Sequence, residues 1–252
     1  MGKLIKAELY RTKRVNGFWV FVLFIVLYAA VFPFTPAYNA DSAKTFFTAS
    51  MSMTAIGAML IALMSSYIVG RGYHHRTSMY EVMSGNSPLR IILSKLLSVA
   101  LPVALIVYLA HLAGLGIACT MSTDSIEDVL QREPLFFLTL LRYTSFGVLI
   151  TICVKSLLGT GLTYVRLLLE SIGMIIASAI TGTDLMEDTF SADLVVSNTT
   201  SKILNTSFLS QQGVLLASPM SSSVVWQSII GFTLELLLWG GIAYLIYAKK
   251  DY

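Results

Sequence analysis

Apolar positions along the chain gather into long continuous runs rather than alternating with polar positions. Three intervals that contain no Asp, Glu, Lys or Arg run from Val15 to Ala40, from Thr45 to Gly70 and from Leu96 to Thr123. A bilayer core needs about 20 predominantly apolar residues in helical form. We therefore predict one membrane-spanning helix in each of these intervals.

Three further apolar runs each enclose one or two charged residues. They extend from Pro134 to about Val154, from about Gly161 to Thr181 and from about Ser223 to Tyr247. The enclosed charges are Arg142, the pair Arg166 and Glu170, and Glu235. The pattern predicts an all-α, polytopic membrane protein with six transmembrane helices, in a single domain over residues 1–252.

The composition agrees with a chain that lies largely in lipid. Hydrophobic residues make up 56% and charged residues 12% of the sequence, with a mean hydropathy of +0.75. Soluble domains carry about 25% charged residues, so this chain has too few ionic side chains to cover a water-exposed surface. Seventeen Lys and Arg against fourteen Asp and Glu argue against a large nucleic-acid interface.

The distribution of charge predicts the orientation. If six helices alternate, most basic residues fall on one side, in the amino-terminal segment, in 71–95, near Lys155 and at Lys249 and Lys250. The acidic residues Asp41, Asp124, Glu127, Asp128, Glu133, Asp184, Glu187, Asp188 and Asp193 fall on the other side. Because Lys and Arg are retained in the cytoplasm, we predict that both termini are cytoplasmic and that the chain lies in the cell membrane.

Two segments outside the spans have a pattern of their own. Residues 1–16 place Leu4, Ile5 and Leu9 among basic residues, as in a helix that lies in the membrane interface; the alternative is a charged flank that only fixes orientation. The external segment 181–222 has apolar clusters that suggest short amphipathic helices on the outer leaflet. Its alternative is a mobile loop rich in Ser and Thr.

The cytoplasmic segment 71–95 between the second and third spans is the most informative. Ser78 and Glu81 have the spacing of a capping box and Gly85 suits a helix C-terminus, which predicts a short helix from Met79 to Ser84. Ser87 and Pro88 suit the first positions of the next helix. The short helix projects Met79, Tyr80, Val82 and Met83, and Met-rich helices suit insertion into a partner's groove.

Taken together, these features resemble the permease subunits of ABC exporters of the ABC-2 class. The resemblance rests on six spans, an amino-terminal interfacial helix, a short cytoplasmic helix, Gly85-x-Ser87 followed by Arg90 and Lys95, and a long external segment before the last span. Within that class the chain is similar in size to permeases of bacitracin, lantibiotic and amphipathic-peptide exporters.

The resemblance implies a function and partners. It implies export of an amphipathic or antimicrobial peptide, driven by two copies of a separate ATPase subunit that binds ATP and Mg. It implies a homodimer, or a heterodimer with a second permease, and it assigns contact with the ATPase to Met79, Tyr80, Glu81, Val82 and Met83. The alternative from another class is a substrate-binding membrane component or a small ion-coupled carrier without a dedicated ATPase.

Motifs of nucleotide binding and hydrolysis are absent from the sequence. It contains no G-x-x-x-x-G-K-[ST], G-x-S-x-G or H-E-x-x-H motif, so we expect no catalytic site, metal or cofactor in this chain. Cys119 and Cys153 stand in apolar surroundings more than thirty residues apart and are interpreted as small buried hydrophobic residues. His74 and His75 are interpreted as solvated interfacial residues.

A few polar residues inside the spans are candidates for a translocation path or an intramembrane polar network: His111, Arg142, Arg166, Glu170 and Glu235. His111 suits either a hydrogen-bonded packing role or a place on the path. Arg166 and Glu170 have the i, i+4 spacing of an ion pair, whereas Glu235 is protonated, pairs with Arg142 or Arg166, or lines the path.

Small residues form stripes on two of the predicted spans. Ala110, Gly114 and Ala118 follow each other at four-residue intervals, as do Gly173 and Ala177. Such stripes let helices approach closely, either within one chain or across a dimer.

Overall fold

The structure is a computed structural model that describes residues 2–15, 17–35, 41–75, 81, 83–121, 127–181 and 222–249. For the helical residues 51–56, 58, 128, 170, 171, 173–181 and 222–224 only the backbone is described. The described residues form helices and connecting turns, with no strand among them. This confirms the all-α prediction, whereas the predicted external helices between 181 and 222 lie outside the described residues.

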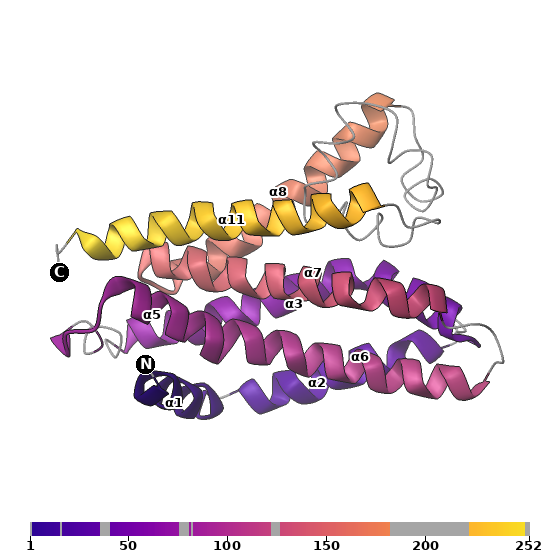
Figure 1. Ribbon diagram of the computed structural model, residues 1–252, viewed down its shortest axis with the longest axis horizontal. Helices are drawn as coiled ribbons and strands as arrows, with labels where there is room; N and C mark the ends of the chain where they lie inside the picture. Colours follow the sequence, from indigo (N-terminus) through magenta and orange to yellow (C-terminus); the bar gives the residue numbers. More distant parts are fainter. Residues whose placement is uncertain are drawn as a thin grey trace.

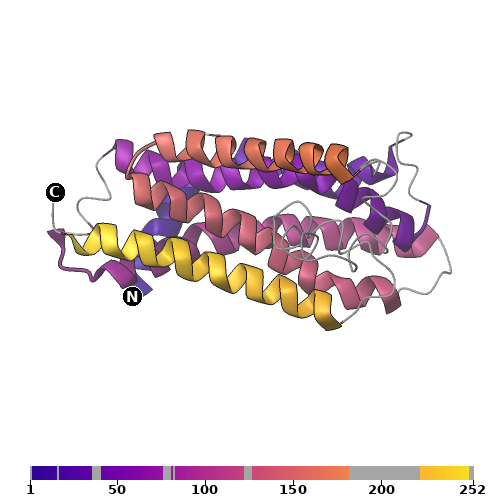
Figure 2. The same ribbon diagram turned by 90° about the horizontal axis from the view of Figure 1, so that it is seen from above.

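Most helices run side by side in an elongated bundle (Figures 1 and 2). In chain order they are α1 (Gly2–Lys13), α2 (Phe18–Val31), the 3-10 turn η1 (Phe32–Phe34), α3 (Ala43–His74), α5 (Pro88–Lys95), the π-helical turn η2 (Leu96–Ala100), α6 (Leu101–Met121), α7 (Glu127–Val154), α8 (Leu158–Thr181) and α11 (Ser222–Ala248). The end of the bundle that contains α1, the start of α5 and the carboxyl end of α11 is called the α1 end (Figure 1).

Several of these helices are suited to a bilayer. Within the part of the chain that the structure describes, three helices are long and apolar enough to cross a membrane: Pro88–Met121, Val129–Val154 and Val225–Ala248. A fourth span would result if α1 and the α2–η1 helix were taken together. The helices indicate a membrane protein, while the six spans expected from the sequence stay a prediction.

The first helix is separated from the second by a sharp bend. The two helices meet at 80°, and Gly17 at the junction has φ +88, a left-handed conformation that glycine adopts without steric cost. As a result α1 lies across the side of the bundle instead of continuing α2 (Figure 1). A separate amino-terminal helix, predicted over 1–16, is therefore present as Gly2–Lys13.

The centre of the bundle is the crossing of α3 and α7. A Cβ atom placed on Gly147 of α7 would lie 2.4 Å from the carbonyl oxygen of Ala62 in α3, so the crossing requires glycine there. The Ser65 hydroxyl donates a hydrogen bond of 3.2 Å to the Thr144 carbonyl across the same contact. The small residues at the crossing and the hydrogen bond from Ser65 allow the two helices to approach this closely.

The stripe of small residues on α6 packs within the chain. Ala110, Gly114 and Ala118 are all buried, and a Cβ atom on Gly114 would lie 2.5 Å from the ring of Phe46 in α3. Of the two alternatives that the sequence left open, packing within one chain or across a dimer, this stripe therefore shows packing within the chain. For Gly173 and Ala177 only the backbone is described, so the packing of that stripe stays a prediction.

The turn into α5 matches the sequence pattern. Gly85 has φ +76, Ser87 is the extended residue before the helix, and Pro88 is its first residue. The side chain of Ser87 makes no capping hydrogen bond, so the proline and the extended backbone at Ser87 mark this start rather than a side-chain cap. Of the short helix predicted from Met79 to Ser84, only Glu81, Met83 and Ser84 are described, the first two being helical.

The fourth predicted span starts earlier than the sequence suggested. Helix α7 begins at Glu127 and contains Pro134 in its interior, whereas the sequence pattern placed the start at Pro134. Proline removes one backbone hydrogen bond, and here it lies on the exposed side of the helix. The charged first turns therefore belong to the helix that continues as the apolar span.

The helices differ in how much of them the rest of the chain covers. In the most apolar stretch of α7, 72% of the residues are buried, whereas in that of α11 only 11% are buried. Helix α11 therefore lies on the outside of the bundle (Figure 1), where its leucines face the surroundings.

Candidate functional site

Four charged residues from three separate segments meet at the α1 end. Lys95, the last residue of α5, places its Nζ 2.9 Å from Glu8 Oε1 and 2.9 Å from Glu81 Oε2. Arg11 pairs with Glu8 within α1 and reaches Glu81 Oε1 at 3.2 Å. We call Glu8, Arg11, Glu81 and Lys95 the junction cluster.

The junction cluster is shielded from solvent. The side chain of Lys95 is fully buried and that of Glu8 nearly so. Helix α1 packs on α5 and on the π turn that follows Lys95, and such turns often occur at functional sites. A buried ammonium is costly without a counter-charge, and here the carboxyl groups of Glu8 and Glu81 supply it.

Burial and neighbouring charges separate the acidities of the two carboxyls. Burial raises the pKa of Glu81, and a hydrogen bond with Glu8 adds to this, so that the pKa reaches about 7 despite Lys95. Burial acts in the same direction on Glu8, but Lys95, the hydrogen bond with Glu81 and Arg11 outweigh it and lower its pKa to about 2. The two carboxyls therefore share one proton over most of this range.

Two tyrosines extend the junction to the other helices at this end. The hydroxyls of Tyr73 in α3 and Tyr247 in α11 are hydrogen-bonded to each other. Lys95 Nζ lies 5.7 Å from the centre of the Tyr73 ring, and Lys155 Nζ lies 5.3 Å from that of Tyr247. These cation–π contacts connect the cluster to the ends of α3, α7 and α11.

Of the five residues expected to contact an ATPase, the structure describes Glu81, which belongs to this cluster, and Met83, two positions after it. Met79, Tyr80 and Val82 fall outside the described residues, as does Ser78 of the expected capping box. Met83 is 80% exposed. Glu81 turns its side chain inward to Lys95, and its carbonyl accepts hydrogen bonds from Ser84 and Asn86 at 2.8 and 3.0 Å, which close the turn before α5.

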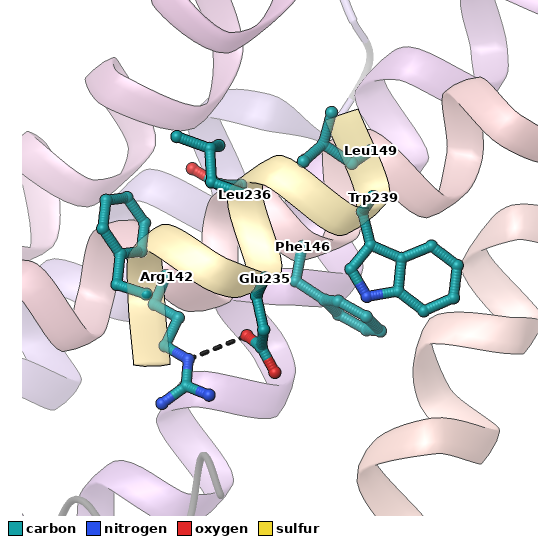
Figure 3. A pocket seen from close by; sticks show the side chains of 8 residues that line it. Arg142, Phe146, Leu149, Glu235, Leu236 and Trp239 are labelled. Atoms are coloured by element: carbon teal, nitrogen blue, oxygen red, sulfur yellow. Dashed lines mark hydrogen bonds and ion pairs between the residues drawn. The ribbon is translucent and has the colours of Figure 1, made fainter. Parts of the chain in front are cut away.

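A second ionic cluster lies in the apolar part of the bundle. Arg142 Nε on α7 donates to Glu235 Oε2 on α11 at 2.8 Å (Figure 3), and Arg166 Nη2 on α8 lies 3.5 Å from Glu235 Oε1. We call these three residues the intramembrane triad. Of the roles left open for Glu235, pairing with arginine is therefore present, and it involves both arginines.

The triad borders a small groove on α7 and α11. Phe146 and Trp239 lie beside the Arg142–Glu235 pair in Figure 3, and Ser145, Leu149, Phe232 and Leu236 complete the lining. The guanidinium of Arg166 lies 5.0 Å from the centre of the Phe146 ring. The side chain of Glu170, expected to pair with Arg166, lies outside the described residues.

His111 has a partner that its own helix did not reveal. Its Nε2 is 3.0 Å from Glu133 Oε1 on α7, and both side chains are buried. The rings of Phe46, Phe47 and Phe136 surround it at centroid distances of 5.4, 6.1 and 4.5 Å. Of the two roles considered for His111, the hydrogen-bonded packing role fits this enclosure.

Sequence reasoning missed the junction cluster and Glu133. Two signals marked members of the cluster: Glu8 is the only acidic residue before Asp41, and Lys95 is followed by the uncharged run of a predicted span. No such signal marked Glu133, which is 22 positions from His111. Neither signal identifies a partner, because the partners lie on other helices.

The described residues offer no candidate metal site beside these clusters. Among the described residues, no group of three or more His, Cys, Asp or Glu is placed to bind a metal, and both cysteines are free thiols.

No protein-family model matches the chain, and neither a curated protein nor a solved structure shows significant similarity to it.

Proposed function

We propose that this chain is the membrane-spanning permease subunit of an ATP-driven exporter. Its cargo is an amphipathic or antimicrobial peptide, or a similar lipid-seeking molecule, that is secreted or expelled for self-protection. The junction cluster carries the proposal: the exposed Met83 is two residues from Glu81, which is bound to both α1 and α5. An ATPase that pushes on this segment would move both helices.

Ionic contacts in a buried site suit this transmission of force. Lys95 is fully buried and paired on two sides, so displacing Glu81 without α5 would break its contacts with both Lys95 and Arg11 and leave Glu8 as their only carboxylate in the cluster, which is unfavourable in a buried site. The Tyr73–Tyr247 hydrogen bond extends the connection to α3 and α11. ATP hydrolysis takes place on the separate subunit, with Mg bound there, and this chain is not itself an enzyme.

The intramembrane triad is the proposed responding element. Its three residues belong to α7, α8 and α11, so a shift of α8 or α11 against α7 changes its ion pairs. Charges inside a membrane usually face protein or a water-filled path. An ionic centre beside apolar walls supports a cargo that carries both charged and apolar groups.

The proposed topology has six spans, formed by α2, α3, α5 with α6, α7, α8 and α11. The presence of α1 and the carboxyl end of α11 at one end of the bundle (Figure 1) agrees with an even number of crossings. With the α1 end in the cytoplasm of the cell, two copies of this chain, or one with a related permease, enclose the path and contact two ATPase subunits.

Co-purification tests the proposal. The tagged full chain, isolated from its native host in mild detergent, is expected to retain a nucleotide-binding subunit and to stimulate its ATP hydrolysis. Met83→Asp should abolish the stimulation because a charge replaces an exposed apolar contact. Met121→Asp is the matched control. Met121 is also an exposed methionine, but it is the last residue of α6 and lies far from the α1 end of the bundle (Figure 1).

Two outcomes would overturn the exporter assignment. One is recovery of the intact chain without any nucleotide-binding protein. The other is stimulated ATP hydrolysis that Met83→Asp and Met121→Asp reduce equally. In either case a carrier without an ATPase would account better for the chain.

A further inference from the structure

The exposed face of α1 carries only positive charge. Lys3, Lys6, Tyr10 and Lys13 are exposed, and their spacing of three, four and three residues places them on one side of the helix. Arg14 follows directly and is also exposed, with its guanidinium 4.4 Å from the centre of the Tyr10 ring.

The inward position of Glu8 leaves this face without a counter-charge of its own. Glu8 is the only acidic residue before Asp41, and it points to the opposite side of α1, where Lys95 and Arg11 bind it. The junction cluster therefore separates the charges of α1, with the acid inside and the lysines outside.

The cationic face adjoins a surface suited to lipid tails. Helix α2 begins beyond the 80° bend with Trp19 and Val20 exposed, followed by Leu23, Phe24 and Leu27. The Trp19 indole donates a 3.2 Å hydrogen bond to the Lys13 carbonyl, which ties the two helices together. Trp and Tyr are enriched where a membrane meets water, so Trp19 and Tyr10 mark the headgroup level.

We propose that Lys3, Lys6, Lys13 and Arg14 form a binding site for anionic phospholipid headgroups. The occupant follows from charge complementarity: four cations beside an apolar helix fit a phosphate whose acyl chains lie along α2. A zwitterionic headgroup carries its own positive charge and gains less from this face. The site holds α1 against the bilayer, and this inference does not depend on transport or on an ATPase.

Native mass spectrometry of the purified full chain tests the site. The chain is titrated with phosphatidylglycerol or with phosphatidylcholine, and a Kd is obtained for the first lipid bound. The variant Lys3→Gln/Lys6→Gln/Lys13→Gln is expected to bind phosphatidylglycerol at least about fivefold more weakly, the loss for a single lysine at a membrane surface. Its affinity for phosphatidylcholine should not change.

A control with the same change of charge separates this site from general attraction. Lys44→Gln/Arg90→Gln/Lys249→Gln removes three exposed cations that lie outside α1, two of them at the same end of the bundle (Figure 1), and should retain the affinity for phosphatidylglycerol. If the triple α1 variant does not fold, Lys6→Gln alone is expected to show a smaller loss in the same direction. Equal affinity of the unaltered chain for both lipids, or an equal loss in both triple variants, would overturn the proposal.

Discussion

Lys95 Nζ lies 2.9 Å from Glu8 Oε1, although the two residues are 87 positions apart in the sequence. The contact joins the amino-terminal helix to the start of the third predicted span, and Glu81 joins the same ammonium from the segment between them. Helix α1, which does not run along the bundle, is thus connected to it by ion pairs as well as by apolar packing.

Removing the ammonium should destabilise the chain strongly. Lys95→Met leaves Glu8 and Glu81 with the half-buried Arg11 as their remaining cation, so a loss of about 3 kcal/mol in the free energy of unfolding is expected, the lower end for breaking a buried ion pair. The measurement is unfolding in detergent micelles. Arg90→Met changes an exposed cation of the same helix and should have little effect. Similar losses in the two variants would contradict a buried ion pair at Lys95.

The stability of the protein should depend on pH through the two carboxyls. The pKa of Glu81 is raised from 4.5 to about 7, so the folded state holds its proton more tightly, and the resulting stability is lost as the pH rises from about 4.5 to about 7. The pKa of Glu8 is lowered to about 2, so its contribution is present above about pH 4.5 and is lost as the pH falls towards 2.

The Glu81 contribution can be isolated by substitution. Glu81→Gln should flatten the decline in thermal stability between about pH 4.5 and about pH 7, because the glutamine side chain does not titrate. Glu127→Gln, at an exposed carboxyl of α7, should keep the slope of the unaltered chain. An unchanged slope in Glu81→Gln would show that this carboxyl does not titrate in the range.

The two arginines of the intramembrane triad should couple unequally to Glu235. Arg142 is 3% exposed and 2.8 Å from the carboxylate, whereas Arg166 is 37% exposed and 3.5 Å away. Double-mutant cycles of Glu235→Gln with Arg142→Gln and with Arg166→Gln should give about 1 kcal/mol or more for the first pair and a few tenths for the second. The reverse order would contradict the arrangement.

The crossing of α3 and α7 should not accept a larger residue. Gly147→Ala places a methyl group 2.4 Å from the Ala62 carbonyl oxygen, and the shift of the helices that this requires should cost about 1–3 kcal/mol. At Gly116 in α6 a Cβ atom meets nothing within 4 Å, so Gly116→Ala is the matched control and should be neutral or slightly stabilising. Equal melting temperatures for the two variants would refute the close crossing.

Local features of the fold were accessible from the sequence because they depend on neighbouring residues. The start of α5 at Pro88, the left-handed turn at Gly85 and a separate helix within residues 1–16 agree with the structure. The start of α7 was placed too late, because Pro134 was interpreted as a boundary and the helix passes through it. A proline signals the loss of one hydrogen bond, which a long helix can accommodate.

The sequence by itself determined that this low-charge chain has helices apolar enough to cross a membrane, because the hydrophobic content of a segment is a property of its own residues. Only the tertiary structure decided which polar side chains meet. Lys95 pairs with Glu8, His111 with Glu133, and Glu235 with arginines on two other helices. A hydrogen bond or ion pair needs atoms within a few ångströms, and for residues far apart in the chain that distance is set by how the helices pack.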